Sequence, residues 1–172
     1  MVAIEAIEAE AAGQTRLARL ESSDGMELRR FFYRLSPETI YRRFHSPLAR
    51  PEQAQPKRLL DIDHHDREAV VAVLDGEIIG VARYARRSGT HVAEVAVVVA
   101  DDWQRQGLAT RMLGALSELA RPAGIRQFSV SMQADNRAAL RLLRRFHPDA
   151  ELTHSQGIYE ATIPVARSHR WA

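Results

Sequence analysis

The sequence contains no cysteine. Disulfides, thiolate metal sites and a cysteine nucleophile are therefore excluded. The chain also lacks any apolar run near the roughly 18 residues that a membrane span requires, and its N-terminus shows no signal-peptide pattern. We therefore expect a cytoplasmic protein that has no membrane partner.

Lysine is almost absent as well, because Lys57 is the only lysine and every other basic residue except histidine is arginine. One explanation is the base composition of the genome, and another is avoidance of self-modification by a lysine-acylating enzyme. Both explanations stay open. The formal net charge is +2, which gives no reason to expect a nucleic-acid partner.

The length of 172 residues suits one domain with a sizeable core. We expect this domain to occupy residues 14–165. The acidic, alanine-rich residues 1–13 are expected to form a disordered arm, and residues 166–172 a basic tail.

Hydrophobic periodicity predicts an alternation of strands and helices. The expected strands are residues 15–20, 69–74, 78–85, 91–99 and 127–132, with two short strands within 151–163. The expected helices are an amphipathic segment around 28–35, one that starts at Ser36-Pro37-Glu38, a short one from 46–56 to about Leu60, residues 107–120, and one that starts at Asp135-Asn136.

Two connections in this order restrict the topology. Asp75-Gly76 between apolar strands is a strong hairpin signal. The helix over 107–120 joins strands 91–99 and 127–132, which requires a parallel, right-handed crossover. The predicted fold class is therefore α/β, with a mixed central sheet of about seven strands flanked by helices.

The most informative stretch is residues 97–110. An apolar run ends at two aspartates, a turn with one glycine follows, and a helical pattern then begins. Such a turn presents backbone N–H groups without intrahelical partners at the positive end of a helix, which suits a phosphate group. The alternative is an ordinary connection between a strand and a helix.

The segment Gln104-Arg105-Gln106-Gly107-Leu108-Ala109 fits the Q/R-x-x-G-x-G/A loop of the GNAT superfamily of N-acetyltransferases. The strand over 93–99 and the segments 31–44 and 63–73 resemble those of bacterial protein lysine acetyltransferases. The resemblance implies a GNAT fold with a parallel strand–helix–strand core that binds acyl-coenzyme A. It also implies transfer of an acetyl group from acetyl-coenzyme A, as co-substrate, to a lysine amine of a protein partner such as an acyl-coenzyme A synthetase.

The resemblance assigns cofactor contacts to this strand, to this loop and to the start of a later helix. The residues concerned are Val97, Val98, Val99, Gln104, Arg105, Gln106, Gly107, Leu108, Ala109, Thr110 and Asn136. The main chain of Val97 and Val99 would pair with the pantetheine arm, and the N–H groups of 105–110 would hold the pyrophosphate. Gly107 is expected to allow close approach of the phosphates. For Asn136 the alternative is a helix cap, which Asp135 could already supply.

Glu94 is the candidate general base, because the family carries its proposed catalytic glutamate at the matching position. A lysine amine with a pKa of about 10.4 is neutral in only about one molecule in a thousand at pH 7.4. A positioned base contributes roughly 10²–10⁴-fold to the rate. The alternative is a carboxylate at a strand end that is solvated or paired with an arginine such as Arg83.

Two features depart from the family pattern. Many members carry a tyrosine seven residues after the asparagine, which protonates the leaving thiolate, but this chain has Leu143 there. Arg145 replaces the usual glycine before Phe146. We therefore assign no general acid.

A cluster of acidic residues and histidines precedes the strand at 69–74. It consists of Asp61, Asp63, His64, His65 and Asp66. Adjacent histidines point apart in an extended chain, so a polar loop is favoured over a metal site, and we expect no metal.

Two other functions stay open. A small-molecule amine acetyltransferase would need an aromatic wall, for which Phe44, Tyr84 and Tyr159 are the candidates. A non-catalytic acyl-coenzyme A sensor would keep the loop but lack turnover. The oligomeric state is open between monomer and homodimer. The arginines at 29, 30, 34, 42 and 43 form either a contact for an acidic partner surface or a solvated helix face.

Overall fold

The computed structural model describes residues 15–44 and 59–165. Several expected features lie outside these residues. They are the arm at 1–13, most of the helix that starts in 46–56, Lys57 and the basic tail. The strands are β1 (Arg16–Arg19), β2 (Arg67–Leu74), β3 (Glu77–Arg86), β4 (Val92–Val99), β5 (Gln127–Gln133), β6 (Thr153–Ser155) and β7 (Ile158–Pro164). The helices are α1 (Gly25–Tyr33), α2 (Pro37–Phe44), the short 3₁₀ helix η2 (Asp101–Trp103), α4 (Leu108–Ala120) and α5 (Arg137–Phe146).

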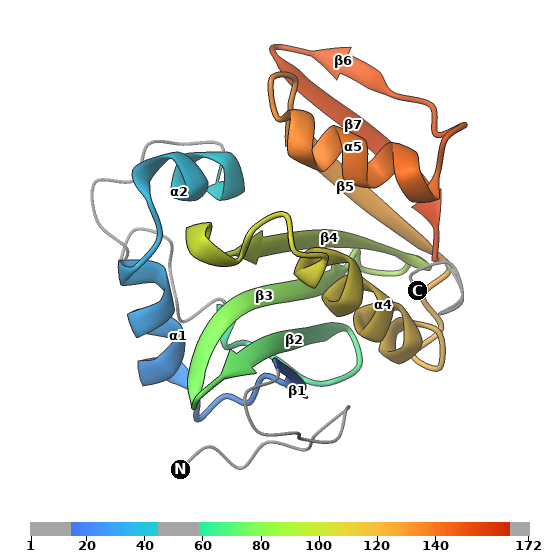
Figure 1. Ribbon diagram of the computed structural model, residues 1–172. Helices are drawn as coiled ribbons and strands as arrows, with labels where there is room; N and C mark the ends of the chain where they lie inside the picture. The colour runs from blue at the N-terminus through green and yellow to red at the C-terminus, as the bar shows by residue number, and fades with distance from the viewer. Residues whose placement is uncertain (1–14, 45–58, 166–172) are drawn as a thin grey trace.

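One sheet of seven strands contains all the described strands, in the order β1-β2-β3-β4-β5-β7-β6. Only β4 and β5 pair in parallel, and every other pair of neighbours is antiparallel. The predicted mixed sheet and the parallel crossover through the helix near 107–120 are confirmed (Figure 1). None of the helices in the described ranges is both long and apolar enough to cross a membrane.

The hairpin between β2 and β3 forms at the predicted Asp75-Gly76. Leu74 pairs with Glu77, so the loop has two residues, and both have positive φ, 49° for Asp75 and 80° for Gly76. This is the type I′ geometry that matches the twist of the flanking strands. The turn therefore fixes the register of β2 against β3.

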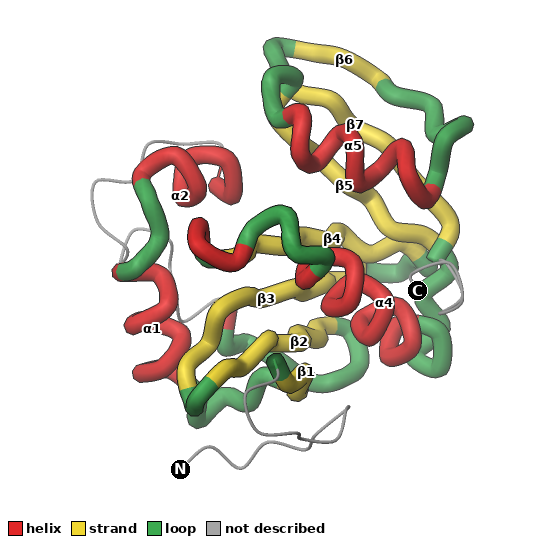
Figure 2. The backbone as a smooth tube through the Cα atoms, viewed as in Figure 1, coloured by secondary structure: helices red, strands yellow, loops and turns green. Residues whose placement is uncertain are grey.

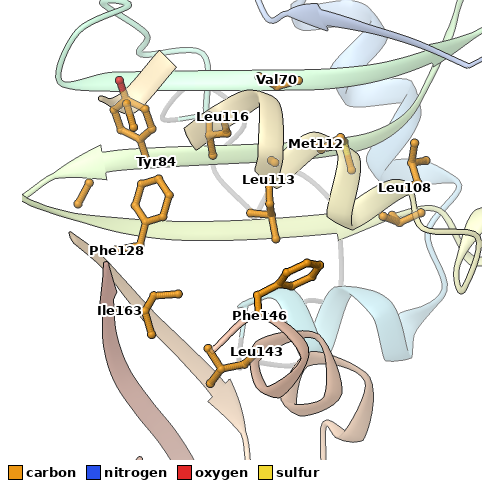
Figure 3. Packing of buried hydrophobic residues seen from close by; sticks show 14 of the residues in the cluster. Val70, Tyr84, Leu108, Met112, Leu113, Leu116, Phe128, Leu143, Phe146 and Ile163 are labelled. Atoms are coloured by element: carbon orange, nitrogen blue, oxygen red, sulfur yellow. The ribbon is translucent and has the colours of Figure 1, made fainter. Parts of the chain in front are cut away.

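Each face of the sheet has its own core. On one face, Leu113 of α4 packs with Leu143 and Phe146 of α5 and with Phe128 and Ile163 of the sheet (Figure 3). On the other face, the buried side chains of α1 and the start of α2 cover β1 to β4. The members of this second core include Leu28, Phe31, Phe32, Ile40, Val71, Val81 and Val98.

The sheet opens between its two parallel strands. β4 pairs with β3 over nearly its whole length, but it pairs with β5 only from Val92–Gln127 to Glu94–Ser129. After these pairs the two strands diverge, and β5 continues with β7 as a separate arm (Figures 1 and 2). The edge of β4 beyond Glu94 therefore has no strand partner on the side of β5.

The main chain of Val97 and Val99 faces this open edge. The N–H of Ala100 donates to the carbonyl of Ile79, 2.9 Å away, so even-numbered residues of β4 direct their polar groups toward β3. Odd-numbered residues then direct theirs to the opposite edge, because these directions alternate along a strand. The carbonyl of Val99 accepts instead from the side chain of Gln104 at 3.1 Å.

Candidate functional site

A cavity of about 300 Å³ lies where β4 and β5 separate. The C-terminal end of α2, the middle of β4, the outer part of β5 and the inner face of α5 form its walls. Three of the predicted site residues, Glu94, Val97 and Asn136, line this cavity. Leu113, Leu143 and Phe146, seen in Figure 3, close its apolar side.

Glu94 lies at the point where the two strands separate. It is opposite Ser129 in the last parallel pair and opposite Ala85 in β3, and its side chain is exposed. Its carboxylate makes no hydrogen bond or ion pair with any residue of the described ranges. An ion pair with Arg83 is therefore not formed, although the two side chains interact electrostatically.

Two half-buried arginines flank Glu94. Burial and the nearby positive charge of Arg83 lower the pKa of Arg43 to about 10, while the charge of Glu94 acts in the opposite direction. Burial likewise lowers the pKa of Arg83, against the raising effect of Glu94. Partial removal from water disfavours the charged form of a guanidinium, and a neighbouring carboxylate favours it.

The loop before α4 leaves the backbone N–H groups of residues 105–110 without a partner in the described ranges. Arg105 has φ of 62° and Gly107 has φ of 80°, so two residues of the loop just before α4 adopt a left-handed backbone conformation. Gly107 is the N-cap of α4 and supplies no side-chain cap. The N–H groups of residues 105–110 donate to no acceptor in the described parts of the chain. Successive N–H groups in such a turn form a concave site for an anion, which the dipole of α4 reinforces.

The backbone conformation gives a further reason for glycine at 107. A Cβ at this position would meet no protein atom within 4 Å. Within the protein itself, the requirement for glycine comes from the positive φ, which β-branched and bulky residues rarely adopt.

The side chains of the loop have structural contacts. The amide of Gln104 donates to Thr39 Oγ1 and to the carbonyl of Val99, both at 3.1 Å, and that of Gln106 donates to the carbonyl of Asp102 at 3.0 Å. Gln104 thus fastens the loop to α2 and β4. The side chains of Val98 and Leu108 are buried in the two cores, so only their main chain could reach a ligand.

Asn136 itself caps α5. Its side-chain oxygen accepts from the N–H of Ala139 at 3.1 Å, so the suggestion that Asp135 supplies the cap is wrong. The amide nitrogen of Asn136 donates to no residue that the structure describes. This leaves the NH₂ group available to the cavity, and both roles considered for Asn136 remain compatible.

The residues before β2 form a turn. The carboxylate of Asp63 accepts from the N–H groups of His65, Asp66 and Arg67 at 2.7–3.0 Å. His64 bonds to Glu68 at 3.0 Å and to Glu21 at 3.2 Å. No group of three or more histidine or acidic residues within 15–44 and 59–165 could hold a metal ion.

Sequence reasoning missed several residues that line the cavity. They are Ser131, Met132, Leu142 and His147. His147 follows the inward-facing Leu143 by four residues, so continuing the buried stripe of this helix would have found it.

Comparisons with known proteins agree with this geometry. A profile of the acetyltransferase (GNAT) family matches residues 26–147. Acetyltransferase PA5475 of Pseudomonas aeruginosa is 37% identical over 123 residues, which cover 69% of this chain and 66% of that protein. Acetyltransferase Pat of Mycolicibacterium smegmatis is 34% identical over 113 residues, which cover 64% of this chain and 34% of that protein. The chain thus spans just under two thirds of one relative's length and about one third of the other's.

Solved structures share the fold. The GNAT domain of S. lividans PAT superposes with a TM-score of 0.81 at 24% identity and covers 94% of this chain and 96% of that one. A cAMP-binding acyltransferase from Mycobacterium smegmatis superposes with a TM-score of 0.65 at 24% identity, covering 96% of this chain and 49% of that one. The family profile covers most of the described domain, and the open sheet has the expected strand pairing, so the chain belongs to the GNAT family of acetyltransferases.

Proposed function

We propose that this protein transfers an acetyl group from acetyl-coenzyme A to a lysine amine of a protein substrate, with Glu94 as general base. The observation that carries the proposal is the position of Glu94: an exposed carboxylate without an ion pair in the described residues, on the wall of the cavity at the point where β4 and β5 separate.

The free main-chain groups fit acetyl-coenzyme A. The N–H groups of 105–110 suit its pyrophosphate. On the open edge of β4, the main chain of Val97 and the N–H of Val99 suit the amides of its pantetheine arm. The NH₂ group of Asn136 suits one of its acceptor oxygens. When bound, the co-substrate supplies a thioester, from which an amine can take the acetyl group directly.

Glu94 supplies the proton acceptor that this transfer needs. An ammonium group cannot attack a carbonyl, and at pH 7.4 only about one lysine amine in a thousand is neutral. A carboxylate held at the mouth of the cavity removes the proton as the amine attacks, which is the role that contributes roughly 10²–10⁴-fold. Leu143 lies where many relatives have a tyrosine and cannot donate a proton to the leaving thiolate.

A protein acceptor is supported by the composition of the cavity wall. Of the three aromatic residues considered for a closed acceptor pocket, only Phe44 lines the cavity. Tyr84 is fully buried and donates to the carbonyl of His65 at 3.0 Å, and the ring of Tyr159 contacts that of His154 at a tilted angle. We extend the proposal to acyl-coenzyme A synthetases as substrates, on the resemblance to bacterial protein lysine acetyltransferases.

An acceptor screen tests the proposal. Release of free thiol from acetyl-coenzyme A is measured with folded proteins, short lysine peptides and free amines as acceptors. We expect the highest kcat/KM with a folded protein, because a wide contact surface contributes binding energy to the transition state. Turnover confined to free amines would favour a small-molecule acetyltransferase, and binding without turnover a sensor.

A further inference from the structure

The register of the sheet places a positive charge beside Glu94. Ala85 lies opposite Glu94, and Arg83 lies opposite Ala96, two residues further along β4. Directly opposed residues of antiparallel strands project from the same face, so Arg83 and Glu94 are diagonal neighbours on one face. The residues around them on this face, Ala69, Ala85 and Ala96, have small side chains.

A second positive charge comes from α2. Arg43 lines the same cavity as Glu94, and its guanidinium lies 4.8 Å from the ring centre of Phe44. The charges of Arg83 and Glu94 both act on it. Two guanidinium groups from different elements thus interact electrostatically with one carboxylate.

The other arginines nearby already have acceptors. Arg42 pairs with Glu38 at 2.8 Å, Arg67 pairs with Asp63 at 3.0 Å, and Arg87 donates to Ser129 at 2.8 Å. By contrast, neither Arg43 nor Arg83 makes a hydrogen bond or ion pair with any residue of the described ranges. Half-buried cations without acceptors are costly, and an anion that binds them relieves this cost.

We propose that Arg43 and Arg83 form a carboxylate-binding subsite for the acceptor, beside the base Glu94. An acceptor that carries a carboxylate close to its amine would place the carboxylate on the two guanidinium groups and the amine at Glu94. Guanidinium groups bind carboxylates through paired, charge-assisted hydrogen bonds. The preferred acceptor is therefore a lysine with an acidic neighbour, or a small amine that bears its own carboxylate. This inference rests on the proposed acetyl transfer and specifies its substrate.

Three peptides of equal length test the subsite, with glutamate, glutamine or arginine beside one lysine. For the wild-type protein we expect kcat/KM for the glutamate peptide to exceed that for the glutamine peptide about tenfold, mainly through KM. R83Q and R43Q should each bring the ratio of kcat/KM for the glutamate and glutamine peptides close to one. The matched control is R126Q, which neutralises an exposed arginine outside the cavity and should behave as wild type.

Binding of the labelled glutamate peptide, followed by fluorescence polarisation, gives a readout that does not require turnover. Weaker binding to R83Q and R43Q than to R126Q supports the subsite, even if no acceptor is acetylated and the proposed function fails. Free lysine and lysinamide, which lacks the carboxylate, are compared as small acceptors. Equal binding of the peptide to all variants overturns the subsite. Equal rates on the glutamate and glutamine peptides also overturn it, if free lysine is not preferred over lysinamide. A preference for free lysine over lysinamide, without a peptide preference, assigns the subsite to small acids. Melting temperatures of the variants report whether each one is folded.

Discussion

Glu94 and Ser129 form the last parallel pair between β4 and β5 before the two strands separate. The sheet is therefore continuous up to the candidate base and open beyond it. The main-chain groups assigned to the donor all lie further along the chain from this pair. They are those of Val97 and Val99 and the N–H groups of 105–110. The base is thus held by regular sheet pairing at the edge of the site, where a precise position matters most.

Replacing Glu94 by glutamine should lower turnover at least tenfold while leaving acetyl-coenzyme A affinity unchanged. Glutamine keeps the size of the side chain but cannot accept the proton, so the loss falls within the range of a general base. Steady-state rates and calorimetric binding measure the two quantities. E160Q, which neutralises an exposed glutamate on β7, is the matched control. An unchanged rate for E94Q would leave Glu94 with no role in proton transfer.

The substitution G107V should abolish the rise in melting temperature caused by acetyl-coenzyme A. Saturation at 100 times the dissociation constant adds about 2.7 kcal/mol to the free energy of unfolding of the wild type. The matched control is G124V. Gly124 has φ of 81°, a Cβ added there would also meet nothing within 4 Å, and the residue lies after the C-terminal end of α4, away from the loop. Both variants carry backbone strain of roughly 1–2 kcal/mol, but only G107V should lose the ligand response. A normal response in G107V would move the pyrophosphate site elsewhere.

The substitution D101A should weaken the contact between the start of α2 and η2, the short helix that precedes the loop at 104–110. The Asp101 carboxylate accepts from the N–H of Ser36 at 3.0 Å, from Ser36 Oγ at 2.6 Å and from Thr39 Oγ1 at 2.8 Å. Loss of these bonds should lower the free energy of unfolding by an amount on the order of 1 kcal/mol. D102A, at a neighbouring exposed aspartate, should change it little.

The effect of D101A should depend on pH. Burial alone would raise the pKa of Asp101, but the hydrogen bonds from Ser36 and Thr39 outweigh it and hold the pKa below its ordinary value. A carboxyl group whose pKa is lowered by folding contributes its full stabilisation above the unfolded pKa of about 3.9. This stabilisation is lost as the pH falls through the folded pKa. Denaturant titrations should therefore show the two proteins converging below about pH 4. A constant difference down to pH 2 would contradict this.

His64 should stabilise the fold more at acidic than at alkaline pH. Burial lowers its pKa, but the hydrogen bonds with Glu68 and Glu21 prevail and raise it above the ordinary value. A group whose pKa is raised by folding contributes its full stabilisation below the unfolded pKa of about 6.5. This stabilisation is lost as the pH rises through the folded pKa. The difference in unfolding free energy between wild type and H64Q should therefore shrink as the pH rises above about 6.5. H65Q, at an exposed neighbour, is the control.

Incubation with acetyl-coenzyme A alone should leave the protein almost unmodified. Lys57 and the α-amino group are its only amine acceptors. In a mixed lysate, mass spectrometry should instead find acetylated lysines on other proteins, above the background without enzyme. Marking of small amines alone would exclude the protein acceptor.

The sequence by itself determined the elements and their order. The apolar repeats of α4 and α5, the alternation in β5 and the Asp75-Gly76 turn are local signals, because side-chain period and backbone φ depend on neighbouring residues. The loop at 104–109 could be located for the same reason. Its left-handed φ at Gly107 is a local property of the backbone.

Only the tertiary structure decided where the strands part and which side chains meet there. Arg43, Arg83 and Glu94 are far apart in sequence, and a shift of one residue in the register of β3 against β4 would place Arg83 on the opposite face. The attachment of Gln104 to Thr39 also depends on packing between elements. Register and helix docking are set by the sum of many long-range contacts, and no local pattern in the chain contains that sum.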